Sequence, residues 1–275
     1  MPSRWQLSAP ESHVLQYRGS CYLTEPFKLA VKELVTRRVL RVQRIQPGGL
    51  SGGRPKYALV DGPLIASEVP PPLSSVLGVY RAHRKSLNVL EAESTVADHV
   101  TGVSVKQLRK AARQEFGKVE HYHVREVVPA LVERGLLSAS GSRGLKREPD
   151  WDWTPAGRQA DSELGEWMAL GRKSLASCAA KGDLLTAAAY VEGAGALLLL
   201  MPDLYPELQQ LESRLQQSAV GHGAADGPDT RDGLHLDFGS AATDFGGAEG
   251  SGGVGDLGGL GDLGGFAGGG DGGGL

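Results

Sequence analysis

Basic side chains gather in the middle of the chain, in a pattern typical of a surface that binds phosphates. Lysine and arginine contact phosphates mainly through charge, so they give affinity for nucleic acids without reading the base sequence. We predict that nine residues bind a nucleic acid or another anionic surface: Lys106, Arg109, Lys110, Arg113, Lys118, Arg125, Arg143, Lys146 and Arg147. The first part of the chain adds further basic residues, namely Arg37, Arg38, Arg41, Arg44, Arg54 and Lys56.

An alternative interpretation is that these charges only solvate a helical face. Acidic residues are interspersed with the basic ones: Glu115, Glu120, Glu126, Glu133 and Glu148. Asn and Gln, which read base edges, are scarce near the helix that precedes Gly135. The sequence leaves both interpretations open.

Other residue types that carry chemistry do not form a constellation. His121 and His123 are two positions apart, so they point to different faces of a helix, and we interpret them as surface histidines. Cys21 and Cys178 lack a neighbouring His-Asp pattern and do not form a C-x-x-C motif. We therefore predict no catalytic residue, no metal and no cofactor, and a reduced, cytoplasmic protein.

Residues 95–158 must position the basic side chains, and they read as helix, turn, helix and a two-stranded wing. Ser104 and Gln107 form a capping box that opens a helix closed by Gly117. A second helix is predicted over 121–134, where Pro129 should kink it or delay its start. Residues 136–139 and 150–153 are predicted as the wing, and a long helix should follow from Pro155 to about residue 180.

The N-terminal part repeats this plan. A capping box at Ser8 and Glu11 predicts a helix up to Gly19, and Thr24 should cap a second helix. Residues 39–45 and 56–60 are predicted as antiparallel strands. After the proline run 69–72, which should not be helical, we expect one helix carrying Leu73, Val76, Leu77 and Tyr80, and another over 88–101.

The most apolar segment, 184–201, just reaches the length of a membrane-spanning helix. Glu192 near its middle would be costly in a bilayer, so we predict a buried helix that packs through small residues and keep membrane contact as the alternative. Residues 207–217 are predicted as a further amphipathic helix.

The C-terminal segment 221–275 has a composition of its own. It holds 22 glycines, nine acidic residues and one arginine. Removing these charges from the chain totals of 32 acidic and 29 basic residues leaves 23 and 28, so residues 1–220 carry a formal charge of +5 and the segment one of −8. We predict that the segment is disordered and that its acidic and apolar residues dock weakly on a partner or on the basic surface of the same chain, or that it only adds solubility.

Several parts of the chain carry resemblances to known families. Residues 131–137 and the run from Trp153 to Arg158 are similar to the recognition-helix exit and the wing-to-helix return of MarR- and PadR-type winged-helix regulators, although Pro129 departs from that pattern. The opening 10–19, the switch at 34–42, the proline break, residues 131–137 and the tail resemble an uncharacterised bacterial family with Gly-rich C-terminal tails. The alternation of helices and hairpins distantly resembles the Golgi phosphoprotein family, which implies lipid binding.

Together these patterns predict a mainly α protein with short β-hairpins, of the α+β class. We expect winged-helix-like units at 1–68 and 73–180, a helical segment at 181–217 and a disordered acidic tail at 218–275. The predicted function is a non-enzymatic binding or regulatory protein that contacts DNA or a protein partner. The alternatives are a peripheral membrane adaptor for anionic lipid headgroups and an enzyme with a cryptic site. The sequence does not indicate the oligomeric state.

Overall fold

The computed structural model describes residues 6–18, 24–45, 56–89, 98–140, 150–204 and 206. This part of the protein is mainly helical with small antiparallel β-hairpins, which confirms the predicted fold class. The helices are α1 (Ala9–Gln16), α2 (Glu25–Thr36), α3 (Pro71–His83), α4 (Val105–Phe116), α5 (Val128–Glu133), α6 (Pro155–Lys181) and α7 (Leu184–Ala194). The strands are β1 (Leu40–Ile45), β2 (Lys56–Asp61), β3 (Lys85–Val89), β4 (Asp98–Ser104), β5 (Leu137–Ser140) and β6 (Asp150–Trp153). Shorter helical turns are η1 (Val119–His121), η2 (His123–Val127), η3 (Gly195–Leu200) and η4 (Pro202–Leu204).

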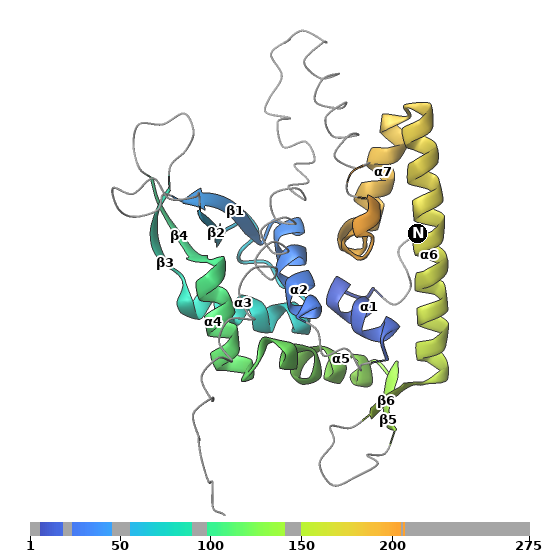
Figure 1. Ribbon diagram of the computed structural model, residues 1–275, viewed down its shortest axis with the longest axis horizontal. Helices are drawn as coiled ribbons and strands as arrows, with labels where there is room; N and C mark the ends of the chain where they lie inside the picture. Colours follow the sequence, from blue (N-terminus) through green and yellow to red (C-terminus); the bar gives the residue numbers. More distant parts are fainter. Residues whose placement is uncertain are drawn as a thin grey trace, which may run out of the picture.

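The first four strands close into a small antiparallel barrel in the order β1-β2-β4-β3 (Figure 1). The predicted β1–β2 hairpin is present, and it pairs Leu40 with Asp61 and Ile45 with Lys56. The prediction of a helix over 88–101 is wrong, because β3 and β4 are paired strands that meet β2 through the partners Leu59 and Val103. The β-branched residues of β4 suit a pleated sheet. The edge of β2 that does not pair with β1 supplies backbone hydrogen bonds to β4, which an isolated segment would lack.

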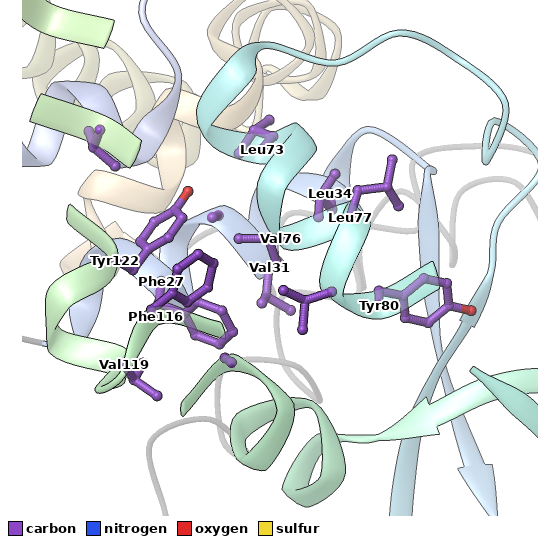
Figure 2. Close-up of a cluster of buried hydrophobic side chains, with 14 of the residues drawn as sticks. Phe27, Val31, Leu34, Leu73, Val76, Leu77, Tyr80, Phe116, Val119 and Tyr122 are labelled. Atoms are coloured by element: carbon purple, nitrogen blue, oxygen red, sulfur yellow. The ribbon is translucent and has the colours of Figure 1, made fainter. Parts of the chain in front are cut away.

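One hydrophobic core draws on both of the predicted winged-helix-like units. Figure 2 shows Phe27 of α2 beside Phe116 and Tyr122, with Val31 and Val76 in the same cluster. The Phe27 and Tyr122 ring centroids are 5.7 Å apart in an edge-to-face arrangement, a favoured geometry for aromatic pairs. The predicted boundary between residues 68 and 73 therefore falls between elements that share one core.

The helix starts follow local chemistry, with two corrections. The capping boxes of α1 and α4 form as predicted, at Ser8 and Ser104. Thr24 does not cap α2, because its backbone is already helical (φ −70°, ψ −8°) and its side chain makes no capping hydrogen bond. The proline run was predicted to be free of helix, yet α3 begins within it at Pro71, since proline is tolerated in a first turn, where its missing N–H would have no helical partner.

The predicted helix over 121–134 is broken into three pieces, as expected from Pro129. A 3-10 turn (η1) and a π-type turn (η2) precede α5, in which Pro129 occupies the first turn. A proline ring blocks the hydrogen bond that would continue an α-helix through this position, so the regular helix starts late.

The predicted wing is present as the two-stranded ribbon β5–β6, which pairs Leu137 with Trp153. The Trp153 indole N–H donates to the carbonyl oxygen of Leu15 at 2.7 Å, and the Arg18 guanidinium lies 4.2 Å from the Trp153 ring centroid. These contacts fasten the ribbon to the C-terminal end of α1. The chain between the strands, residues 141–149, lies outside the described residues.

The long helix α6 is confirmed, and α7 packs against it around a second core (Figure 1). The 184–201 segment is buried through several small and apolar residues, namely Ala187, Val191, Ala194, Leu198, Leu199 and Met201. Leu199 of η3 also contacts Ala9 and Leu29, so the hairpin returns to α1 and α2. Among the described residues, no helix is long and apolar enough to cross a membrane. The helix predicted over 207–217 and the predicted disordered tail lie outside the described residues.

Candidate functional site

The candidate site is the solvent-facing side of α4, whose ends are fixed by its own sequence. The Ser104 hydroxyl accepts a hydrogen bond from the Gln107 backbone N–H at 3.3 Å, which completes the N-terminal cap. At the other end Gly117 adopts φ +80°, a conformation that side-chain-bearing residues rarely take. The helix is therefore set to three turns, and its faces are defined.

The two faces of α4 differ sharply in chemistry. Its inner face buries apolar side chains, namely Leu108, Ala111, Ala112 and Phe116. Basic residues recur on the opposite side at intervals of three and four, so they form one stripe along the helix. Lys106, Lys110 and Arg113 are exposed, whereas Arg109 is half-buried. We call these four residues the α4 basic face.

Several ion pairs among the described residues engage basic side chains that lie away from the α4 basic face. Arg37 pairs with Glu33, Arg84 with Asp61, Arg134 with Glu11, Arg172 with Asp203 and Lys28 with Glu25. In the part of the chain that the structure describes, no carboxylate pairs with the three exposed members of the α4 basic face. Their charge is directed at solvent and remains available to an anionic ligand.

Two of the predicted site residues follow the helix. Lys118 is exposed and follows Gly117 directly after the end of α4. Arg125 is exposed, but its guanidinium donates to the Glu115 carbonyl oxygen at 3.0 Å, which ties η2 to the last turn of α4. Arg125 therefore also has a structural role.

The predicted basic residues of the wing lie outside the described chain, and some of those in the first unit make contacts within the protein. Arg143, Lys146 and Arg147 lie outside the described residues. In Figure 1, the helical segment that ends with α5 separates α4 from the strands β5 and β6. Arg37 is paired, and Arg41 donates to the Asp61 carbonyl oxygen at 3.4 Å. The side chains of Arg44, Arg54 and Lys56 are not among those described.

The helix that resembles a recognition helix has a different surface from α4. Of its six residues, Val128, Ala130 and Leu131 are buried. The exposed positions are Pro129, Val132 and Glu133. None of these carries an amide or a positive charge, so α5 itself offers nothing that reads bases or contacts phosphates. The winged-helix resemblance stays a prediction.

The histidine prediction is half wrong. His121 is half-buried, but His123 is 1% exposed, and its Nδ1 lies 2.5 Å from the Glu120 carbonyl oxygen. The π-type turn directs His123 inward, which a simple helical wheel does not predict. No group of three His, Cys, Asp or Glu side chains suited to a metal occurs among the described residues. Cys178 is buried, and Cys21 lies outside the described residues.

A buried acidic pair was missed at the sequence level. Glu11 and Glu33 are both fully buried. Glu33 accepts hydrogen bonds from the Ala9 N–H at 2.7 Å and the Arg37 guanidinium at 2.8 Å, while Glu11 lies 3.1 Å from the Arg134 guanidinium. The available signal was the position of Glu33, which lies three residues after Ala30 on the apolar stripe of α2.

Electrostatics around this pair are shaped by burial. Burial raises the pKa of Glu33, against the opposing effects of Arg37 and the Ala9 N–H. Burial also lowers the pKa of His13. The charge of Glu25 acts in the opposite direction, and the nearby His123 lowers this pKa further. The Ser12 hydroxyl is buried and has no hydrogen-bond partner among the described residues. The acidic pair therefore connects α1 and α2 with Arg134, the residue that follows α5.

Comparisons with protein-family models, with curated proteins and with solved structures give no match for this chain. The α4 basic face is therefore the feature of this chain that bears most directly on function.

Proposed function

We propose that this protein is a non-enzymatic binding protein that contacts duplex nucleic acid through the α4 basic face. The observation that carries the proposal is a stripe of basic residues of which the exposed members, Lys106, Lys110 and Arg113, have no carboxylate partner in the described chain. Charges left unpaired on a stable helix are the usual means by which proteins hold a phosphate backbone.

The dimensions of the stripe suit DNA. Lys106 and Arg113 are seven residues apart, a rise of about 10 Å along an α-helix. One strand of B-form DNA advances about 3.4 Å per phosphate, so this length corresponds to about three phosphates. The number of exposed basic side chains is therefore similar to the number of phosphates within reach.

The proposed contact is to the backbone of the duplex. Gln107 is engaged in the N-terminal cap of α4, which leaves Gln114 as the exposed amide of this helix. Lysine and arginine on phosphates give register and affinity, whereas base contacts give sequence preference. We expect binding that varies little with sequence and strongly with salt. This function belongs in the cytoplasm, in agreement with the cysteine content.

The test is a salt titration of duplex DNA binding, followed by fluorescence anisotropy. The double variant Lys106→Ala and Lys110→Ala should bind about 10- to 100-fold more weakly at 0.1 M salt, because two counterion-releasing contacts are lost. The slope of log K against log salt should become shallower by about two. The matched control, Lys173→Ala and Lys181→Ala, removes the same charge from exposed positions of α6 and should bind like the native protein.

Equal losses in the two double variants would contradict the proposal, because the effect would then reflect net charge alone. A liposome flotation assay separates the membrane alternative. Flotation that depends on anionic lipid, without DNA binding at 0.05 M salt, would replace nucleic acid by a lipid surface as the ligand.

A further inference from the structure

The charge of the chain is divided between its two parts. Residues 221–275 carry nine carboxylates and one arginine, whereas residues 1–220 have an excess of five basic residues. The three exposed side chains of the α4 basic face are uncompensated within the described residues. An acidic segment of the same chain is therefore the anion that this face meets at the highest local concentration.

We propose that the acidic C-terminal segment, residues 221–275, docks on the α4 basic face and competes there with nucleic acid. The docking rests on charge complementarity between two parts of one chain, and the competition rests on the proposed function. The segment would act as an internal mimic of a polyanion that lowers the affinity for DNA at low salt.

The spacing of the carboxylates suits this role. They are single residues distributed along the segment: Asp226, Asp229, Asp232, Asp237, Asp244, Glu249, Asp256, Asp262 and Asp271. Most of the residues between them are glycine, alanine or another small residue, which restrict the backbone little. Two or three carboxylates can therefore come to the stripe together.

The segment is long enough to reach α4 from where the described chain ends. Figure 1 places α4 and α7 on opposite sides of the described structure. A compact body of about 200 residues has a radius of gyration of about 17 Å. A flexible chain of about 9 to 54 residues, the separation between residue 217 and the first and last acidic positions, spans about 15 to 40 Å on average, and the helix predicted over 207–217 adds up to about 16 Å. The acidic positions therefore cover the distances needed to cross the body.

Because the acidic segment belongs to the same chain, weak ion contacts are sufficient to hold it on the α4 basic face. A flexible linker holds its end group at an effective concentration in the millimolar range. Exposed ion pairs are individually weak and screened by salt, so the docking should be lost as ionic strength rises. The competition should accordingly be visible near 0.05 M salt and absent near 0.5 M.

The experiment compares the full native chain with a full-length neutral-tail variant, in which the nine carboxylates become Asn or Gln. We expect the neutral-tail variant to bind duplex DNA about tenfold more tightly at 0.05 M salt, with no difference near 0.5 M. In the matched control, Leu257, Leu260, Leu263 and Phe266 become Ser, which keeps the charge, and its affinity for DNA should equal that of the native chain.

A second measurement separates docking from general repulsion between the tail and DNA. A fluorescent peptide of residues 226–262 is titrated onto the neutral-tail variant without DNA. Its anisotropy should rise, and the rise should disappear with Lys106→Ala and Lys110→Ala but persist with Lys173→Ala and Lys181→Ala. If the variant binds DNA through Lys106 and Lys110 but not the peptide, the docking is overturned and the proposed function stands. If it binds the peptide but no duplex, the proposed function fails and the docking stands.

Discussion

Individual residues show how the interior of this protein accommodates charge. Glu33 is fully buried, yet it accepts hydrogen bonds from a guanidinium on its own helix and from the first N–H of α1. A buried carboxylate without such partners would be strongly unfavourable, and removal of one partner is costly for the same reason. Glu33 therefore fixes the relative position of α1 and α2 at the expense of some stability.

The raised pKa of Glu33 predicts a pH dependence of stability. A carboxyl whose pKa is higher in the folded protein than in the unfolded chain contributes stability that is fully present below the ordinary value of 4.5 and is lost as the pH rises through the folded value. The free energy of unfolding of the native protein, minus that of Glu33→Gln, should therefore fall as the pH rises above about 4.5. Urea denaturation at several pH values measures this difference.

His13 has a lowered pKa and gives the opposite trend in a neighbouring pH range, below its ordinary value of 6.5. Both proteins in the Glu33 comparison retain His13, so its contribution largely cancels from the difference. Parallel pH profiles for the native protein and Glu33→Gln would mean that the Glu33 carboxyl titrates as it does in the unfolded chain.

At the scale of elements, the ribbon β5–β6 and the start of α6 are joined by a close backbone approach. A Cβ atom built on Gly157 would lie 1.9 Å from the carbonyl oxygen of Leu136. The Thr154 hydroxyl donates to the Gly135 carbonyl oxygen and accepts from the Gly157 N–H at 3.0 Å, so the turn has little freedom to move. Glycine at position 157 is required by this contact.

We predict that Gly157→Ala destabilises the protein by about 2 kcal/mol or more, because the added methyl group meets backbone rather than a flexible side chain. Gly165 is the matched control, since it lies in the same helix and a Cβ there has no neighbouring atom within 4 Å. Gly165→Ala should stabilise by about 0.5–1 kcal/mol. Chemical denaturation of both variants measures the difference, and equal stability would show that Leu136 and α6 are not held this close.

At the scale of the whole molecule, the barrel and the helices of both predicted units enclose one core. Leu59 of β2 is fully buried in the same cluster as Leu131 of α5 and Ala160 of α6. Strand β2 pairs with β4 across the predicted unit boundary. A substitution at one end of this core should therefore also lower the stability of the elements at the other end.

We predict that Leu59→Ala lowers the stability of both predicted units together, by about 2–5 kcal/mol. In a Trp5→Phe background the remaining tryptophans, Trp151, Trp153 and Trp167, all lie in the second unit. The denaturation midpoint that they report should shift as much as the midpoint from circular dichroism. Leu64→Ala, at a position that is 47% exposed, is the control and should shift neither midpoint appreciably. An unchanged tryptophan midpoint in Leu59→Ala would indicate units that unfold independently.

Local sequence signals determined much of this structure. The capping boxes at Ser8 and Ser104, the delay at Pro129 and the ribbon before Pro155 were all predicted correctly. The spacing that makes the α4 basic face was also evident in the sequence. Residues three and four apart lie on the same side of a helix, whichever element packs against its other side. These features depend on interactions between residues a few positions apart.

Only the tertiary structure decided the rest. Whether residues 98–104 form a strand depended on the free edge of β2, about 40 residues earlier in the chain. The inward side chains of Glu33 and His123 depended on a neighbouring helix and a π-type turn. The lack, among the described residues, of a carboxylate partner for Lys106, Lys110 and Arg113 depended on where the described carboxylates lie. Strand pairing, burial and charge compensation are properties of residues distant in sequence, so no local pattern specifies them.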